Sequence, residues 1–239
     1  MRRQLNPLLR KLGYEISKFT PATNSLSRRL QLIRHHQIDL LFDVGANVGQ
    51  FGRGMRRHGY RGRIVSFEPL LSAYTDLQKW VQRDSLWESF NMALGDFDGA
   101  AEINVSMDSQ SSSMLGILPS HTNRSAAAAF SGKESITVQK LDTVFGPLVG
   151  ADRSPSIYLK IDAQGFEKRI IEGAKESLPN ITGIQMEVSI IPLYQDECLL
   201  PEMLKLMDEA GYTLMSLEPG YCDPESGQLL QVDCVFFRP

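Results

Sequence analysis

A glycine turn between a buried strand and a helix constrains this chain more than any other feature of its sequence. In LLFDVGANVGQF (40–51), three apolar residues predict a short buried strand that ends at Asp43. Gly45 and Gly49 predict a tight turn, and an amphipathic helix follows. Because glycine has no Cβ, such a turn lets a ligand approach the backbone at a helix N-terminus. The segment therefore predicts an α/β unit with a ligand site at its turn.

Strand-like and helix-like segments alternate along the rest of the chain. The expected strands are 64–68, 86–94, 100–107, 134–141, 157–162, 181–189, 212–217 and 232–237. The expected helices are 1–19, 26–36, 70–83, 165–174 and 199–210. This alternation predicts an α/β fold with a mostly parallel sheet, covered by helices on both faces. The last two strands would form an antiparallel pair.

The length of 239 residues suits one large α/β domain. We expect a basic helical N-terminal extension (1–38) packed on a domain that spans 39–239. The segment 108–133 is rich in Ser and Ala and has no clear period, so it predicts a lid-like insertion over the site. Plain disorder of that segment is the alternative.

The charge is unevenly distributed along the chain. Residues 1–63 hold 13 Lys and Arg against three acids, although the whole chain carries a net charge of −3. This indicates a basic face that meets an anionic membrane surface or a phosphorylated carrier, with a merely solvated helix as the alternative. No apolar run approaches the roughly 18–20 residues that span a bilayer, and three scattered cysteines fit a reducing compartment. We therefore expect a cytoplasmic protein that binds no nucleic acid. A peripheral contact with the inner membrane face and self-association into a homo-oligomer both stay open.

The acid before the glycine turn narrows the choice of ligand. A carboxylate at Asp43 disfavours a phosphate but favours a ligand with an ammonium or sulfonium group. This points to S-adenosyl-L-methionine (SAM), with the backbone amides around Gly45 and Asn47 facing its methionine portion. Asp43 would favour the ammonium group, directly or through water.

Two further positions complete the predicted cofactor site. Glu68 ends the next strand, where an acid can accept both ribose hydroxyls. Enzymes that bind NAD place an acid similarly, but G-A-N-V-G is not the G-x-G-x-x-G of a dinucleotide site. Met92 and Ala93 follow the third strand, where an adenine ring would lie, although Met92 could instead belong to the core.

The predicted chemistry lies at the ends of two later strands. Lys160 and Asp162 share one face of an otherwise apolar strand, and Glu187 ends the neighbouring strand. One carboxylate could act as general base on a substrate hydroxyl. Alternatively, Asp162 and Glu187 could hold a divalent metal such as Mg²⁺, or Lys160 could form a buried ion pair without a catalytic part.

The Ser/Ala-rich segment offers two candidate contacts to substrate. Ser112 could donate a hydrogen bond to a polyhydroxylated acceptor or to the cofactor, and His121 could be a base or a substrate contact. A solvated loop without either role is the alternative for both.

These pieces together resemble the FkbM family of SAM-dependent methyltransferases. The matching stretches are FDVGANVGQFG (42–52), VSFEP (65–69), NMALGDFDG (91–99), SSSM (111–114), VQKLDTV (138–144), YLKIDAQGFE (158–167) and QMEVS (185–189). The resemblance implies a Rossmann-like class I methyltransferase fold, with a seven-stranded, mostly parallel sheet and an antiparallel last strand. It also implies O-methyl transfer to a hydroxyl of a sugar, polyketide or glycolipid. Val188 departs from the amide that metal-dependent catechol-type methyltransferases place there, which argues against a tightly bound metal.

We therefore expect a SAM-dependent O-methyltransferase that acts on a sugar hydroxyl of a small molecule, of a glycolipid or of another glycosylated secondary metabolite. Two alternatives stay open. One is a nicotinamide-dependent oxidoreductase or epimerase of nucleotide sugars, and the other is a non-catalytic protein that binds SAM or a partner.

Overall fold

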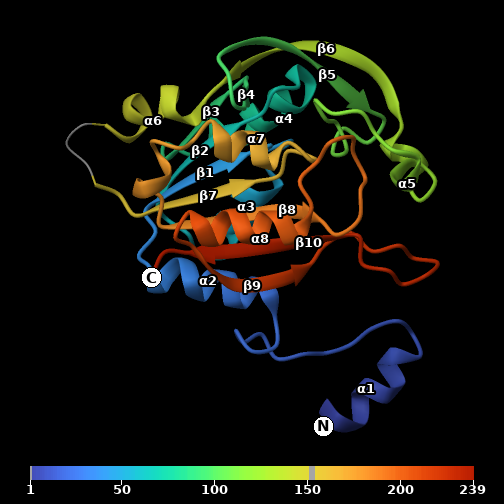
Figure 1. The fold of residues 1–239 in the computed structure, drawn as a ribbon. Helices are drawn as coiled ribbons and strands as arrows, with labels where there is room; N and C mark the ends of the chain where they lie inside the picture. The colour runs from blue at the N-terminus through green and yellow to red at the C-terminus, as the bar shows by residue number, and fades with distance from the viewer. Residues whose placement is uncertain (1, 151–153) are drawn as a thin grey trace.

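Alternating side chains give the central strands two apolar faces, and helices cover both (Figure 1). The computed structural model describes residues 2–150 and 154–239. Leu40, Phe42 and Val44 of the first strand enter one core cluster, whereas Leu41 enters the other. This period of two is what a strand buried on both faces requires.

The main sheet has seven strands in the order β3-β2-β1-β7-β8-β10-β9. They are β1 (Leu40–Val44), β2 (Arg63–Phe67), β3 (Trp87–Phe90), β7 (Ile157–Ile161), β8 (Gly183–Ser189), β9 (Thr213–Pro219) and β10 (Gln231–Phe237). β10 pairs antiparallel with both of its neighbours, and the other pairs in the sheet are parallel. The expected seven-stranded, mostly parallel sheet with an antiparallel end is therefore confirmed.

Three helices cover each face of this sheet. Side chains of α6, α7 and α8 enter the core on one face, and side chains of α2, α3 and α4 enter the core on the other. The helices are α1 (Arg2–Arg10), α2 (Ser25–His35), α3 (Gln50–Arg57), α4 (Leu71–Val81), α5 (Pro119–Thr122), α6 (Leu141–Val149), α7 (Glu167–Glu172) and α8 (Leu200–Glu209). Two short 3-10 turns, η1 (Ala126–Ala128) and η2 (Leu178–Asn180), complete the list. No helix among the described residues combines the length and the apolar character that crossing a membrane requires.

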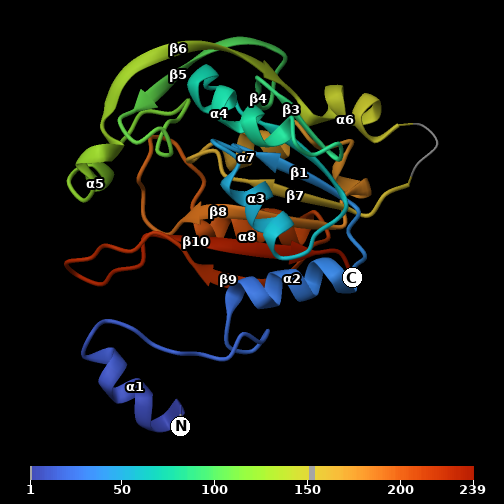
Figure 2. The same cartoon turned by 180° about the vertical axis from the view of Figure 1, so that it is seen from behind.

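A small second sheet arches over one end of the molecule (Figures 1 and 2). Its strands are β4 (Ala93–Leu94), β5 (Gly99–Ser106) and β6 (Phe130–Gln139), in the order β4-β6-β5. The single strand expected at 86–94 is therefore wrong, because β3 and β4 lie in different sheets. The side-chain amide of Asn91 donates to the carbonyls of Glu68 and Pro69 (2.9 and 2.8 Å). These two hydrogen bonds hold the chain in the turn that separates β3 from β4.

The expected irregular segment 108–133 has more structure than its composition indicates. It contains α5 and η1, and β6 begins at Phe130, four residues before the expected strand. At its start, Asp108 accepts hydrogen bonds from the hydroxyls of Ser106 and Ser111 and from the amide of Ser111 (2.8–2.9 Å). The high serine content of this segment favours a solvated loop, but here the serines form hydrogen bonds within their own turn.

The N-terminal region divides into two parts. α2 packs against the edge strand β9, where Arg28 donates to the Ser216 hydroxyl (2.9 Å) and Arg29 forms an ion pair with Glu218. α1 is shorter than the helix expected at 1–19, because the chain turns at Gly13 with φ +79°. Figures 1 and 2 both place α1 beyond β9, the edge strand of the main sheet, and beyond α2, which packs against that strand. Met1 lies outside the described residues, and the division of the chain at 38/39 stays a prediction.

Candidate active site

A cavity of about 450 Å³ opens at the carboxyl ends of β1, β2 and β7, where sites in α/β sheets form. Its size is typical of a small-molecule pocket. Its polar lining residues are Arg29, Asn47, Gln50, Glu68, Ser109, Gln110, Ser112, Lys160, Asp162, Gln164, Gln185, Glu187 and Asp233. Its apolar lining includes Phe67, Leu70, Ala93, Leu94, Ile103, Met114, Phe166 and Ile170.

Four polar residues lie side by side across the middle of the sheet. Ser66, Asp43, Lys160 and Gln185 are register partners on β2, β1, β7 and β8, so they share the face covered by α2, α3 and α4. All four are buried. Buried polar groups are costly unless they are paired, and each of these four has a partner.

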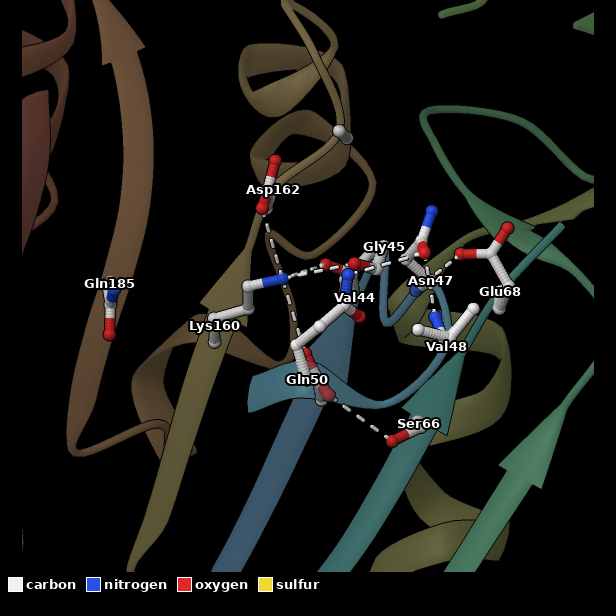
Figure 3. A network of polar contacts seen from close by, with 12 residues as sticks. Val44, Gly45, Asn47, Val48, Gln50, Ser66, Glu68, Lys160, Asp162 and Gln185 are labelled. Atoms are coloured by element: carbon white, nitrogen blue, oxygen red, sulfur yellow. Dashed lines mark hydrogen bonds and ion pairs between the residues drawn. The ribbon is translucent and has the colours of Figure 1, made fainter. Parts of the chain in front are cut away.

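Lys160 is the centre of this row (Figure 3). Its Nζ lies 3.3 Å from Oδ1 of Asp43 and 3.5 Å from Oδ2 of Asp162, and it donates to the carbonyls of Val44 and Gly45 (3.3 and 3.1 Å). Burial lowers the pKa of Lys160, but the carboxylates of Asp162 and Asp43 outweigh it and raise this pKa to about 12. Lys160 is therefore a fixed cation that ties β7 to the glycine turn, rather than a base.

The carboxylate of Asp43 does not reach the cavity. Asp43 is fully buried, and its partners are Lys160 and the hydroxyl of Ser66 (3.4 Å). Asp43 is not among the residues that line the cavity, so its effect on an ammonium group, directly or through water, stays a prediction. Its physical role is to balance the charge of Lys160 beneath the turn.

The glycines of the turn serve internal packing. Gly45 has φ +68°, and a Cβ at this position would lie 1.8 Å from the carbonyl oxygen of Asp162. Gly49 has φ +83°, and its Cβ would lie 2.9 Å from Leu77. We expected glycine here to admit a ligand, but the contacts that exclude a side chain come from the protein itself.

The backbone amides of the turn are also engaged within the protein. The Gly45 amide donates to the carbonyl of Phe67 (3.0 Å), and the Asn47 amide donates to Oε2 of Glu68 (2.7 Å). Both amides therefore have partners within the protein, and their contact with the methionine portion of a cofactor stays a prediction. Gly45 and Asn47 do line the cavity, so contacts from their other atoms stay available.

Glu68 lies where the sequence places it, at the end of β2 and in the wall of the cavity. Its Oε1 accepts from the amide of Leu70 (2.9 Å), so each carboxylate oxygen holds one backbone amide. Burial raises the pKa of Glu68 to about 7, although these amides lower it. Each oxygen retains acceptor capacity toward a hydroxyl in the cavity.

Asp162 and Glu187 converge through a third side chain, Gln164. The Nε2 of Gln164 donates to Oδ1 of Asp162 (2.8 Å) and to Oε2 of Glu187 (2.9 Å). Burial, followed by the neighbouring carboxylates of Asp162, Asp233 and Glu167, raises the pKa of Glu187 well above its usual range. When ionised, Glu187 is therefore a stronger proton acceptor than an ordinary carboxylate.

The loop that carries Gln164 is held from three sides. Gln164 has φ +53°, and its carbonyl accepts from the Ser113 hydroxyl (2.7 Å). The hydroxyl of Tyr194 donates to Oε1 of Gln164 (2.9 Å), which turns the Nε2 toward the carboxylates. Oε1 of the buried Glu167 accepts from the amides of Ala163 and Gly165 (2.9 and 3.3 Å).

The remaining predicted residues have mixed outcomes. Ala93 and Ser112 line the cavity, whereas Met92 packs against the core and does not. His121 is buried in α5, with its ring 5.3 Å from that of Tyr194, and it does not line the cavity, so its role as a base or substrate contact stays a prediction. Burial also lowers the pKa of His121. Ser112 accepts from the amide of Ser106 (3.0 Å), which holds it in place at the wall.

The expected metal site lacks a sufficient set of ligands. Within residues 2–150 and 154–239, no group of three or more His, Cys, Asp or Glu side chains has the arrangement to hold a metal ion. The amide of Gln164 also lies between Asp162 and Glu187 as a donor to both, where a cation would need acceptors. The described residues therefore do not fit a Mg²⁺ ion held by the protein.

Comparison with known proteins decides the family. The sequence profile of the family described as the methyltransferase FkbM domain matches residues 43–214, well over half of the chain. The chain belongs to the FkbM methyltransferase family. The match begins at Asp43 and includes the glycine turn, Glu68, the Gln164 loop and Glu187.

Many solved structures are similar to this FkbM family member, and two of them illustrate the likeness. A methyltransferase FkbM from Methylobacillus flagellatus KT is 16% identical, with 84% of this chain and 43% of that chain covered and a TM-score of 0.48. The chain thus spans less than half of that protein. The magnesium protoporphyrin IX methyltransferase of Synechocystis PCC 6803, solved with bound SAM, is 7% identical, with 90% and 77% covered and a TM-score of 0.49. No curated protein matches the chain.

Several lining residues of this FkbM family chain are not indicated by its sequence pattern. Gln164 lies two residues after the predicted site residue Asp162, but a neutral side chain gives no sign of a charge partner. Asp233, an acid inside the apolar strand VDCVFF, carried the same signal that singled out Lys160. Arg29 lies on a helix outside every motif, and nothing in the sequence around it indicates a position in the cavity wall.

Proposed function

We propose that this protein is a SAM-dependent O-methyltransferase that transfers a methyl group to a sugar hydroxyl, on a glycolipid or another glycosylated metabolite. One observation carries the proposal. A single cavity connects an apolar region beside Glu68 with an acidic region that contains Asp162, Gln164 and Glu187. A methyl transferase needs these two halves, one for the cofactor and one for the acceptor, on either side of the reacting atoms.

The first half fits the cofactor that the family uses. Phe67, Leu94 and Phe166 provide an apolar wall for an aromatic base, and Glu68 offers carboxylate oxygens to ribose hydroxyls. The acidic side chains farther along suit a ligand that carries ammonium and sulfonium groups. When bound, SAM would supply an electrophilic methyl group on its sulfonium sulfur.

The second half supplies alignment and a proton acceptor. Oε1 of Glu187 carries no hydrogen bond from Gln164, so it is the oxygen available to an acceptor hydroxyl. A carboxyl group with a raised pKa takes up such a proton more readily than an ordinary carboxylate. Asp162 is the alternative base, and the shared amide of Gln164 fixes both carboxylates relative to the acceptor.

The polar groups of this half favour a sugar. Asp162, Glu187 and Asp233 present acceptor oxygens, while the amides of Gln164 and Gln185 hold them in position. Several hydroxyl groups on one ring can donate to several such oxygens, as a single isolated alcohol cannot. The proposal of a sugar acceptor rests on this donor and acceptor pattern.

Two measurements test the proposal. Calorimetry with S-adenosylhomocysteine should detect binding at micromolar levels, and Glu68→Ala should weaken it by tenfold or more. Incubation with methyl-labelled SAM and a set of glycosides and glycolipid extracts should yield a methylated product, detected by mass spectrometry. No binding of S-adenosylhomocysteine at millimolar concentration would overturn the cofactor assignment.

The same experiments separate the remaining alternatives. Because the chain belongs to a methyltransferase family, the alternative of a nicotinamide-dependent oxidoreductase or epimerase is not retained. A non-catalytic member would bind S-adenosylhomocysteine but transfer no methyl group to any acceptor in the set. Loss of turnover with retained binding in Asp162→Ala or Glu187→Gln would place the chemistry at this end of the cavity.

A further inference from the structure

The chain before α2 exposes an unusual number of large apolar side chains. Leu8, Leu12, Tyr14, Ile16 and Phe19 are each at least half exposed. They lie within twelve consecutive residues, and we call them the N-terminal apolar surface. Large exposed apolar areas on soluble proteins commonly mark a site that meets a partner or a membrane, and five such side chains in one short segment point to one.

Cations are interleaved with these apolar residues. Arg10, Lys11 and Lys18 are exposed, and Glu15 is the one acid among residues 6–19. The Glu15 carboxylate is paired with Arg10 at 2.9 Å. Apolar and basic side chains along one short segment are typical of an element that lies in the plane of a membrane interface. The ring of Tyr14, which has a polar end, favours the same location, whereas the ring of Phe19 stacks on that of His58, with centroids 6.3 Å apart.

The segment is located where a flat surface can reach it. In Figures 1 and 2, α1 lies beyond the β9 edge of the sheet. No residue of 6–19 lines the cavity. The edge strand β9 adds exposed Leu214, Met215 and Leu217. Of the twelve large apolar side chains that are exposed among the described residues, eight belong to the N-terminal apolar surface or to β9.

We propose that residues 6–19 bind the surface of an anionic lipid membrane, with the N-terminal apolar surface entering the headgroup region and Arg10, Lys11 and Lys18 facing lipid phosphates. The binding itself does not depend on the proposed function. Its consequence does rest on that function, because a membrane-bound enzyme would meet its sugar acceptor on a lipid anchor. The acceptor would then be a glycolipid rather than a free glycoside.

The charges favour a membrane over a second copy of the chain. A two-fold dimer through this surface would bring the same cations of two copies together. An anionic membrane instead attracts each Lys and Arg near its surface, with an effect that falls off within about 10 Å at ordinary salt. Binding should therefore depend on both anionic lipid and ionic strength.

Vesicle sedimentation with the full chain tests the proposal. The vesicles contain phosphatidylcholine alone or a roughly 3:1 mixture with phosphatidylglycerol. We expect the protein to sediment with the mixed vesicles, at least about tenfold more strongly than with phosphatidylcholine alone, and to be released by high salt. No sedimentation with the anionic vesicles at low salt would overturn the proposal.

Two double variants and two matched controls locate the binding. Lys11→Glu/Lys18→Glu and Leu8→Ser/Leu12→Ser should each lower vesicle binding about tenfold or more. The controls, Lys175→Glu/Lys205→Glu and Leu71→Ser/Leu86→Ser, make the same changes at exposed positions elsewhere and should bind like the original chain. Equal losses in variants and controls would show that the segment is not the binding surface.

Two further readouts separate the other outcomes. Sedimentation velocity should show the same oligomeric state for the chain and its segment variants. A dimer that the variants dissociate, without any vesicle binding, would overturn the proposal in favour of an interface between copies. S-adenosylhomocysteine binding should be unchanged in all four variants, so a failure of the cofactor assignment would leave the vesicle result intact.

Discussion

Nζ of Lys160 lies 3.3 Å from Oδ1 of Asp43, in a buried space beneath the turn that follows β1. Asp43, the acid that precedes the glycine turn, therefore forms an ion pair within the sheet and is not a free carboxylate at the mouth of the cavity. It pairs with the cation that also holds the carbonyls of Val44 and Gly45. The stability of the turn and the shape of the cavity therefore depend on the same ion pair.

Lys160→Met should destabilise the protein by about 3–5 kcal/mol, because it leaves the carboxylate of Asp43 buried without a cation. Urea unfolding would measure the loss. The double variant Asp43→Asn/Lys160→Met should recover much of it, since both buried charges are then absent. A double variant as unstable as the single one would contradict this account.

Gln164→Ala should lower kcat by about 10–100-fold and leave the binding of S-adenosylhomocysteine nearly unchanged. The amide of Gln164 lowers the pKa of Glu187, so its removal should shift the acidic limb of the pH–rate profile to higher pH. Tyr194→Phe removes the hydroxyl that orients this amide and should show a smaller shift in the same direction. A lower kcat with an unshifted profile would indicate a structural role alone.

Glu68 should make cofactor binding depend on pH. Its pKa is raised to about 7, so the protein holds this carboxyl group protonated in acidic solution and ionised in basic solution. If the ionised form accepts the ribose hydroxyls, affinity should rise as pH increases through 7, by up to about tenfold per unit below the pKa. Calorimetry between pH 5.5 and 8.5 would show this rise, and Glu68→Gln should flatten it.

Glu167 should make the folded state less stable as pH rises. The unfolded chain releases this proton near pH 4.5, whereas burial keeps it on the folded chain until about pH 8. The folded state therefore binds more protons in this window, and the free energy of unfolding falls as pH rises from 4.5 to 8. Glu167→Gln keeps an acceptor for the Ala163 amide, so it should be more stable than the original chain at pH 8.5 by up to a few kcal/mol. Thermal unfolding at pH 5.5 and 8.5 would compare the two, and an equal pH dependence would exclude Glu167 as the cause.

Removal of divalent metals should leave methyl transfer unchanged. Asp162 and Glu187 share the amide of Gln164, and the described residues provide no group of three metal ligands. Turnover measured before and after dialysis against a chelator would test this. Loss of activity that added Mg²⁺ restores would show a metal that the substrate helps to bind.

The regular part of the fold could be predicted because its apolar strands and glycine turns are local signals. The antiparallel pair of β9 and β10 followed from two apolar runs joined by a turn-rich segment. The break between β3 and β4 could not be predicted, because it depends on the side chain of Asn91 bonding to the carbonyls that follow β2. Such a contact joins segments that are 22 or more residues apart.

The candidate site could be predicted in part for the same reason. Charged residues at strand ends located Glu68, Lys160, Asp162 and Glu187. Their partners could not be assigned, since strand register decides that Asp43 faces Lys160 rather than the cavity. Neither His121 nor Met92 lines the cavity, and polar or apolar character alone does not tell which wall a side chain faces.

The contact of Arg29 with Glu218 has a consequence for work with fragments of this protein. Arg29 lines the cavity from α2, and Glu218 on β9 is buried beneath it. A fragment that starts at Asp39, where the first core strand is about to begin, would remove that guanidinium and leave the carboxylate of Glu218 buried without a cation. The smallest piece that keeps the cavity closed on this side begins near Asn24, which caps α2 through the Ser27 amide. A fragment that starts just before the first strand would thus lose part of the cavity wall together with the N-terminal residues.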